Sequence, residues 1–105
     1  MESEALKQAE AESAAVATAP RVTLESMEAK IARSEYFVVD SVLTVCILQM
    51  ANGFYVVGES APASPSNFNA DLGRKFAYEN AIRQLWKLEG YSLRDRLAAG
   101  EQQKD

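Results

Sequence analysis

The sequence predicts an α+β fold made of a short helix, a β-hairpin or three-stranded antiparallel sheet, a long helix packed on the sheet and a short C-terminal helix. Two observations carry most of this prediction. Asn52-Gly53 stands between two runs rich in Val, Ile, Leu and aromatic residues, which is the strongest local signal for a hairpin. After a Pro/Ser-rich connector at 60–66, apolar residues recur with helical spacing over residues 68–88.

The predicted hairpin strands cover residues 43–50 and 54–59. A type I′ turn at Asn52-Gly53 fits between them, since this turn needs a positive φ at both central residues. Such a two-residue loop places Leu48 opposite Val57, and because cross-strand partners share a face, both faces are then mostly apolar. A sheet with one face in water should alternate apolar and polar residues. We therefore expect helices of the same chain on one face and another subunit on the other.

Before the hairpin, the chain divides into a weakly structured segment and a short helix. Residues 1–21 are rich in Ala and Glu with few apolar side chains, so we expect a mobile or weakly helical segment with nothing to bury. Thr23 is a suitable N-cap for a short helix that runs to residue 34, and residues 36–39 are a candidate third strand. A single α+β domain then spans 22–99, and a polar tail follows at 100–105.

The long predicted helix is capped by Asn67 or Ser66 and is apolar on most sides, which indicates burial on most sides. Gly73 lowers the stability of a helix interior, so it suggests close packing against another backbone. Trp86 belongs to the apolar surface, and Gly90 is expected to end the helix as its C′ residue before a final short helix. The helix also carries a line of small residues, namely Ala70, Gly73, Ala77 and Ala81. This line and the doubly apolar hairpin predict a homo-oligomer, with a dimer favoured.

Composition excludes several classes of protein. A length of 105 residues suits one domain, and the net charge of −4 argues against generic nucleic-acid binding. The one Cys cannot form an intramolecular disulfide, which suits a reducing cytoplasm. The N-terminus does not have the pattern of a signal peptide, and no apolar run approaches the ~18 residues of a membrane span. We expect a cytoplasmic protein without membrane association.

Catalytic chemistry finds little support in the residue types. The sequence has no His, which removes the commonest general base and metal ligand. Cys46 lies among apolar strand residues, where a Cys usually acts as a small hydrophobe rather than a nucleophile. The acidic residues show no compact spacing for a metal or a carboxylate pair. We expect no catalytic residues, no metal and no cofactor, and a protein that is not an enzyme.

A basic stretch of the long helix is the candidate for binding chemistry. Its cations lie beside aromatic residues and would suit an anionic ligand, such as a nucleotide or a phosphate group, or a protein partner. A solvated helix face beside an aromatic core is the plainer interpretation and the favoured one. The candidate ligand or partner surface consists of Arg74, Lys75, Tyr78, Arg83 and Lys87.

From Leu43 onward the sequence resembles a family of small tailed-phage proteins, named after gene product forty-nine of N-four-type phages and its relative in Sf-six-type phages. Four stretches carry the resemblance in order: LTVCILQMANGFYVVGES, PSNFN, LGRKFAYENAI and LWKLEGYSLRDRL. The resemblance implies a phage or prophage origin and a setting in the host cytoplasm, and it implies no activity. The matching positions with structural roles as turn, cap, packing or core residues include Asn52, Gly53, Asn67, Gly73, Trp86 and Gly90.

Two function classes follow from these observations. The first hypothesis is a non-catalytic phage accessory protein that binds a host factor during infection, which includes inhibition of a host defence. The alternative is a small-molecule module that sequesters a nucleotide or a similar anionic ligand through the basic surface. A part in the virion or in replication is a third and weaker hypothesis.

Overall fold

The structure of the protein, a computed structural model, describes residues 4–16 and 19–100. Its elements are α1 (Glu4–Val16), α2 (Leu24–Glu28), β1 (Ile31–Val39), β2 (Leu43–Met50), β3 (Tyr55–Ser60), the 3₁₀ turn η1 (Pro65–Asn67) and α3 (Ala70–Ala98). The strands form one antiparallel sheet in the order β1-β2-β3. The predicted α+β class is confirmed, and the sheet takes the three-stranded of the two predicted forms.

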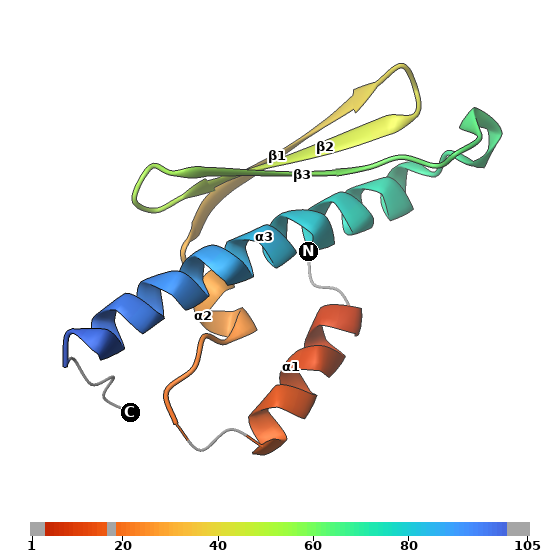
Figure 1. The fold of residues 1–105 in the computed structure, drawn as a ribbon. Coiled ribbons are helices and arrows are strands. Elements are labelled where there is room, and N and C mark those ends of the chain that lie inside the picture. The colour runs from red at the N-terminus through yellow and green to blue at the C-terminus, as the bar shows by residue number, and fades with distance from the viewer. Residues whose placement is uncertain (1–3, 17–18, 101–105) are drawn as a thin grey trace.

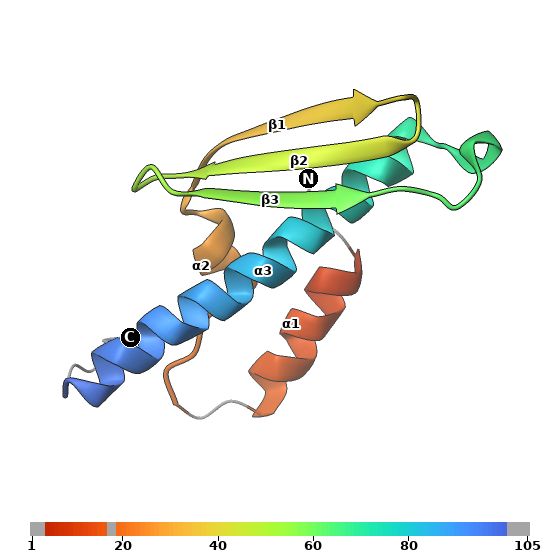
Figure 2. The same cartoon turned by 45° about the horizontal axis from the view of Figure 1, so that its top comes forward.

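The described elements form a sheet layer and a helix layer, with all the described helices on the same side of the sheet (Figure 1). α3 runs obliquely under β3 and β2, and its C-terminal turns extend beyond the ends of the strands (Figure 2). α1 and α2 lie beside α3 on that same side. One face of the sheet therefore packs on helices, and we call the opposite one the outer face.

The hydrophobic core lies between the inner face of the sheet and α3. Alternate residues of β2 point into it, and α2 closes it from the side. Its buried members include Leu24, Met27, Cys46, Leu48, Met50, Val56, Ala77, Tyr78, Ala81, Ile82 and Leu85. The alternation of buried and partly buried residues along β2 is what a sheet covered on one side requires.

Two glycines let α3 lie close to the sheet. A Cβ at Gly58 in β3 would overlap the carbonyl oxygen of Ala77 and the backbone nitrogen of Ala81. A Cβ at Gly73 in α3 would overlap Oγ1 of Thr44 in β2. Gly73 does pack closely, as predicted, but against the side chain of Thr44 in the same chain and not against another backbone. Gly73, Ala77 and Ala81 of the small-residue line are therefore used inside the protomer and no longer argue for a homo-oligomer, which stays a prediction.

The β2–β3 loop is one residue longer than predicted. The N–H of Met50 donates to the carbonyl of Phe54 (2.8 Å), and the N–H of Gly53 donates to the carbonyl of Met50 (2.9 Å), so three residues form the loop. Only Gly53 adopts a positive φ in it (+91°), which excludes the predicted type I′ turn. Asn52 takes another role, because its Oδ1 accepts a hydrogen bond from the N–H of Phe54 (3.0 Å).

This longer loop shifts the register of β2 and β3 by one residue from the prediction. Leu48 lies opposite Val56 instead of Val57. A shift by one residue turns the side chains of one strand to the other face. The inner face thus collects the buried residues of β3, whereas the outer face mixes apolar residues with charged ones. The predicted doubly apolar hairpin is wrong in register, although much of the outer face remains apolar.

The predicted first helix begins at the right residue and is too long. Thr23 caps α2 as expected: its Oγ1 accepts from the N–H of Ser26 (3.0 Å), and Oγ of Ser26 accepts from the N–H of Thr23 (3.1 Å). α2 ends at Glu28, and β1 contains the predicted strand at 36–39 but starts earlier, at Ile31. The apolar–polar spacing around Ile31 fits a helix or a strand, and pairing with β2 decides for the strand.

α3 is one continuous helix of 29 residues, where two helices separated at Gly90 were predicted. Gly90 lies inside the helix without the positive φ of a C′ residue, while Gly100 just beyond the helix has one (+87°). An interior Gly costs about 1 kcal/mol, which the burial of one apolar side chain in the following turn offsets. The N-cap is Asn69, whose Oδ1 accepts from the N–H of Leu72 (3.0 Å), and the predicted cap Asn67 lies in η1 instead.

The described part of the N-terminal segment contains the helix α1, and Leu6 and Glu10 of this helix contact the rest of the chain. Leu6 is buried in the core cluster. The carboxylate of Glu10 forms an ion pair with Arg21 (2.7 Å) and accepts a hydrogen bond from the N–H of Leu24 (3.2 Å). The Arg21 guanidinium holds the pKa of Glu10 below its ordinary value. The expectation that this segment has nothing to bury is wrong for Leu6, while its mobility stays a prediction. Residues 1–3, 17–18 and 101–105, which include most of the predicted tail, lie outside the described residues.

Candidate interaction surfaces

No described helix covers the outer face of the sheet (Figure 2). Large apolar side chains of all three strands lie on this face. Four of its large side chains are between 45% and 52% exposed, and three more in the central strand are partly buried by their neighbours. We call these seven residues the outer patch: Phe37, Val39, Leu43, Val45, Ile47, Tyr55 and Val57. Contiguous exposed apolar patches are typical of interaction sites, which makes the outer patch the first candidate surface.

Charged side chains border the outer patch at both edges of the sheet. Glu35 in β1 is the cross-strand neighbour of Ile47 in the patch, and Glu59 in β3 is the cross-strand neighbour of Val45. Arg33 and Glu35 form an exposed ion pair (3.1 Å) beside it. An apolar centre with a polar border is the usual arrangement of a protein–protein interface.

A second candidate site is a hollow of about 470 Å³ between the β2–β3 loop and the C-terminal half of α3. Its apolar lining includes Phe54 and Leu88, which are both substantially exposed. Lys30, the one cation among the described residues that line it, already forms an ion pair with Glu89. The hollow therefore suits an apolar group better than an anionic ligand.

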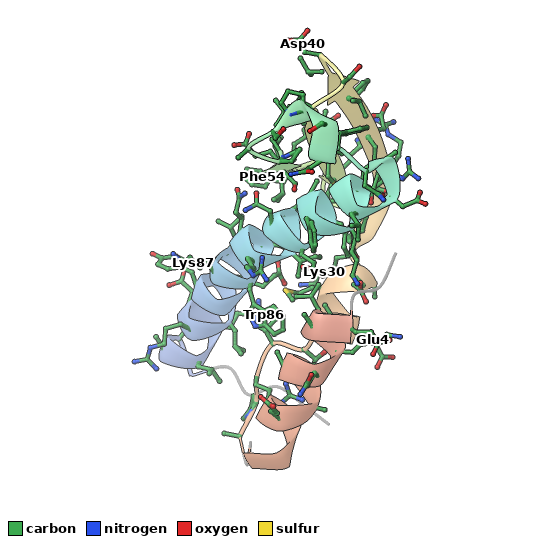
Figure 3. The ribbon with its side chains drawn as sticks, turned by 90° about the vertical axis from the view of Figure 1, so that its right-hand side faces the viewer. Glu4, Lys30, Asp40, Phe54, Trp86 and Lys87 are labelled. Atoms are coloured by element: carbon green, nitrogen blue, oxygen red, sulfur yellow. The ribbon has the colours of Figure 1, made fainter. Side chains whose placement is uncertain are left out.

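The five residues of the predicted ligand or partner surface lie on different sides of α3. Arg74 and Tyr78 are one turn apart, but Arg83 lies nine residues beyond Arg74, which is about two and a half turns. Lys87 projects away from the side of α3 on which Trp86 faces α1 (Figure 3). The residues are thus spread around the helix rather than gathered at one site.

Three of these five side chains also have partners within the chain. The partners are Glu28 for Tyr78, Asp71 for Arg74 and Glu79, at 3.9 Å, for Arg83. Lys75 is partly buried and Lys87 is exposed. The structure does not build one pocket from the five residues, and sequestration of an anionic ligand stays a prediction.

The match to a known protein family covers α2, the sheet and nearly all of α3. A family model matches residues 22–97, which is more than half of the chain. The chain belongs to the Phage protein (N4 Gp49/phage Sf6 gene 66) family. The suspected family is therefore confirmed, and α1 of this phage protein lies outside the matched residues. No curated protein and no solved structure matches the chain.

Two further observations concern the residues that are described in this phage protein. Within 4–16 and 19–100, no helix has both the length and the apolar character that crossing a bilayer requires. Cys46 is fully buried, and burial raises the pKa of its thiol, which favours the unreactive protonated form. This burial agrees with a packing role for Cys46.

The phenol of Tyr78 connects α3 of the phage protein to α2. Its hydroxyl donates to the carboxylate of Glu28 (2.5 Å), and its side chain is buried. Burial, together with Glu28, raises the pKa of Tyr78, and burial raises the pKa of Tyr36 to about 12. A raised pKa means that the folded state holds the proton more tightly than the unfolded chain. Both tyrosines therefore contribute stability that is complete below the ordinary pKa of 10 and is lost as the pH rises above it.

Tyr78→Phe is expected to flatten the alkaline part of the stability curve. Each such phenol lowers the free energy of unfolding by up to about 1.4 kcal/mol per pH unit above its unfolded pKa. Urea denaturation at a series of pH values above the ordinary phenol pKa gives the free energy of unfolding at each pH. In the variant, this free energy should fall with pH less steeply than in the wild type, by up to that amount per pH unit. Loss of the hydrogen bond should lower the stability by about 1 kcal/mol near neutral pH. A slope that stays unchanged in both Tyr78→Phe and Tyr36→Phe would contradict the assigned burial of these phenols.

Proposed function

We propose that this phage protein is a non-catalytic accessory protein that binds a protein of the bacterial host during infection, in the host cytoplasm. The outer patch is the observation that carries the proposal. Its apolar side chains cover one face of the sheet, and its charged border leaves the centre free to lose water on contact. Inhibition of a host defence protein is the form of binding to be tested first.

The shape of the outer patch favours a folded protein as the partner. It is the flat face of a sheet, whereas small ligands bind in concave sites that enclose most of their surface. Phe37 and Tyr55 lie at its opposite edges and are each about half exposed, so they are well placed as aromatic anchors. The partner should present a flat apolar surface with a positive charge that meets Glu59 at the border.

Other features support a role in binding rather than in catalysis. The single Cys is buried, and three carboxylates are paired with phenol or guanidinium groups of α3, namely those of Glu28, Asp71 and Glu79. Among the described residues, no three side chains of metal-ligand type lie together. These features support the proposal that the protein acts by binding through the outer patch.

Affinity purification from the infected or expressing bacterium tests the proposal. The full chain carries a C-terminal tag, complexes are cross-linked in the cell, and the partner is identified and then purified. We expect one host protein in stoichiometric amount. Titration calorimetry with the purified partner should show at least a tenfold loss of affinity for Phe37→Thr/Val57→Thr, because truncation of an interface anchor costs more than 1 kcal/mol. Thr keeps the β-branched shape that a strand prefers.

A matched control removes a similar amount of exposed apolar surface elsewhere. Leu72→Gln/Phe76→Gln changes two side chains of α3 that are each 48% exposed and lie away from the outer patch. This variant should bind the partner like the wild type. Absence of a stoichiometric partner in repeated purifications, or a loss of affinity only in the α3 variant, would refute the proposed surface.

A further inference from the structure

The two edge strands of the sheet differ in how their outward backbone groups are hydrogen-bonded. At the β3 edge, Oδ1 of Asn80 accepts a hydrogen bond from the N–H of Glu59 (3.0 Å), and Nε2 of Gln84 donates to the carbonyl of Val57 (2.8 Å). Both α3 side chains thus occupy backbone groups that another strand would need. The β3 edge is closed to strand pairing.

The pairing pattern shows which backbone groups of β1 point out of the sheet. Met50 and Phe54 form a hydrogen-bonded pair, and such pairs alternate along antiparallel strands. The odd-numbered residues of β2 therefore form their backbone hydrogen bonds with β1, where their partners are Arg33, Glu35 and Phe37. The backbone N–H and C=O groups of Ser34 and Tyr36 then point away from β2, and no described helix pairs with this edge as α3 does with β3. β1 is the open edge.

We propose that β1 pairs antiparallel with β1 of a second copy of this chain, which joins the two sheets into one of six strands. A two-fold axis perpendicular to the sheet relates the copies, so the same strand is used on both sides. Backbone hydrogen bonds and the charges of Arg33 and Glu35 supply the specificity. The outer patches of the two copies become neighbours on one face and stay free for other partners, so this dimer does not depend on the proposed function.

The charges on β1 select one register for this pairing. If Ser34 lies opposite Ser34 of the second copy, then Arg33 lies opposite Glu35 of the second copy, and the symmetry axis repeats this contact. If Glu35 instead lies opposite its own copy, two like charges meet, which is destabilising. If Tyr36 lies opposite its own copy, Glu35 meets an apolar Phe37. Only the register centred on Ser34 pairs both charges twice.

Charged side chains on an edge strand can also prevent pairing with another chain. The test therefore distinguishes whether Arg33 and Glu35 promote the dimer or prevent it. Sedimentation equilibrium of the full chain should reveal a species of about 23 kDa, twice the 11.5 kDa of one chain. Glu35→Arg or Arg33→Glu should each raise the dimer dissociation constant by about tenfold or more, since two contacts become repulsive. The double variant Arg33→Glu/Glu35→Arg should restore the wild-type value, because the charges are again complementary.

A second variant tests the backbone pairing independently of charge. Ser34→Pro removes an outward N–H that β2 does not use, so the sheet is retained and the dimer should be lost. Asn80→Ala, at the closed β3 edge, is the matched control and should leave the β1 dimer intact. Circular dichroism confirms that each variant is folded. A monomer at all concentrations up to about millimolar, or an assembly that survives Ser34→Pro and both single charge reversals, would overturn the proposal.

Discussion

Gly58→Ala should destabilise the domain by at least about 3 kcal/mol, a large part of the 5–15 kcal/mol that holds a small domain folded. The added Cβ would overlap backbone atoms of Ala77 and Ala81, and backbone cannot move aside like a flexible side chain. α3 would have to lift away from β3, and the contacts of the core would loosen along it. Urea denaturation followed by circular dichroism measures the change in the free energy of unfolding.

Gly90→Ala is the matched control for this experiment. Gly90 lies in the same helix, has no positive φ, and its added Cβ meets no atom within 4 Å outside its own helix surroundings. Alanine is the better helix former, so this variant should be more stable than the wild type by about 0.5–1 kcal/mol. Equal effects of the two substitutions would show that α3 does not lie against Gly58 in solution.

Leu48→Ala should lower the free energy of unfolding by about 2–5 kcal/mol, the range found for large-to-small changes in a packed core. Leu48 is fully buried on the inner face of β2, opposite Val56 and close to α3. Truncation removes apolar contacts and leaves a cavity that a rigid sheet and helix close only in part. Denaturation by urea, with an unchanged slope against urea concentration, would report this loss directly.

Ile47→Ala, one residue earlier in the same strand, provides the comparison. Ile47 points to the outer face and is only partly buried, so its truncation should cost about 1 kcal/mol. Measurement at low protein concentration keeps partners and second copies from contributing. If Ile47→Ala cost as much as Leu48→Ala, the one-sided burial of β2 would be wrong. The pair therefore tests the register at the point where sequence reasoning misplaced it.

That misplacement has a simple physical origin. Asn-Gly identifies a turn at residues 52–53 but does not distinguish a two-residue loop from a three-residue loop closed by Gly53 alone. The two loops differ by one residue, and in a strand one residue exchanges the faces. The side chains that belong to the outer patch, such as Val57 and Tyr55, could therefore not be assigned from sequence.

Local signals predicted the helix starts better than the helix ends. Thr23 has its capping partner three residues away, so the start of α2 is encoded locally. The end of α2 depends on β2, because the residues around Ile31 gain more by pairing than by continuing the helix. Gly90 likewise has the residue type of a helix end, and the burial of Leu93 beyond it keeps α3 continuous. Both outcomes depend on tertiary contacts that no local pattern contains.

The candidate site was less predictable than the fold for a related reason. The basic residues of α3 attract attention as a group in sequence, but the helix spreads Arg74 and Arg83 to different sides. The closed edge of the sheet rests on Asn80 and Gln84, whose partners lie 21 and 27 residues away in the chain.

The β1–β2 turn also has no glycine, although Asp40 and Ser41 both adopt a positive φ (52° and 55°).

The position of α3 after the three strands in the sequence has a consequence for synthesis on the ribosome. The three strands are adjacent in sequence and joined by short turns, so they can pair as soon as they emerge. The long helix α3, which covers their inner face and whose Asn80 and Gln84 close the β3 edge, is made after the strands. Until then the nascent sheet exposes both faces and both edges, which is the state most prone to aggregation. The interval before α3 is complete is therefore when this protein depends most on the chaperones of the cell.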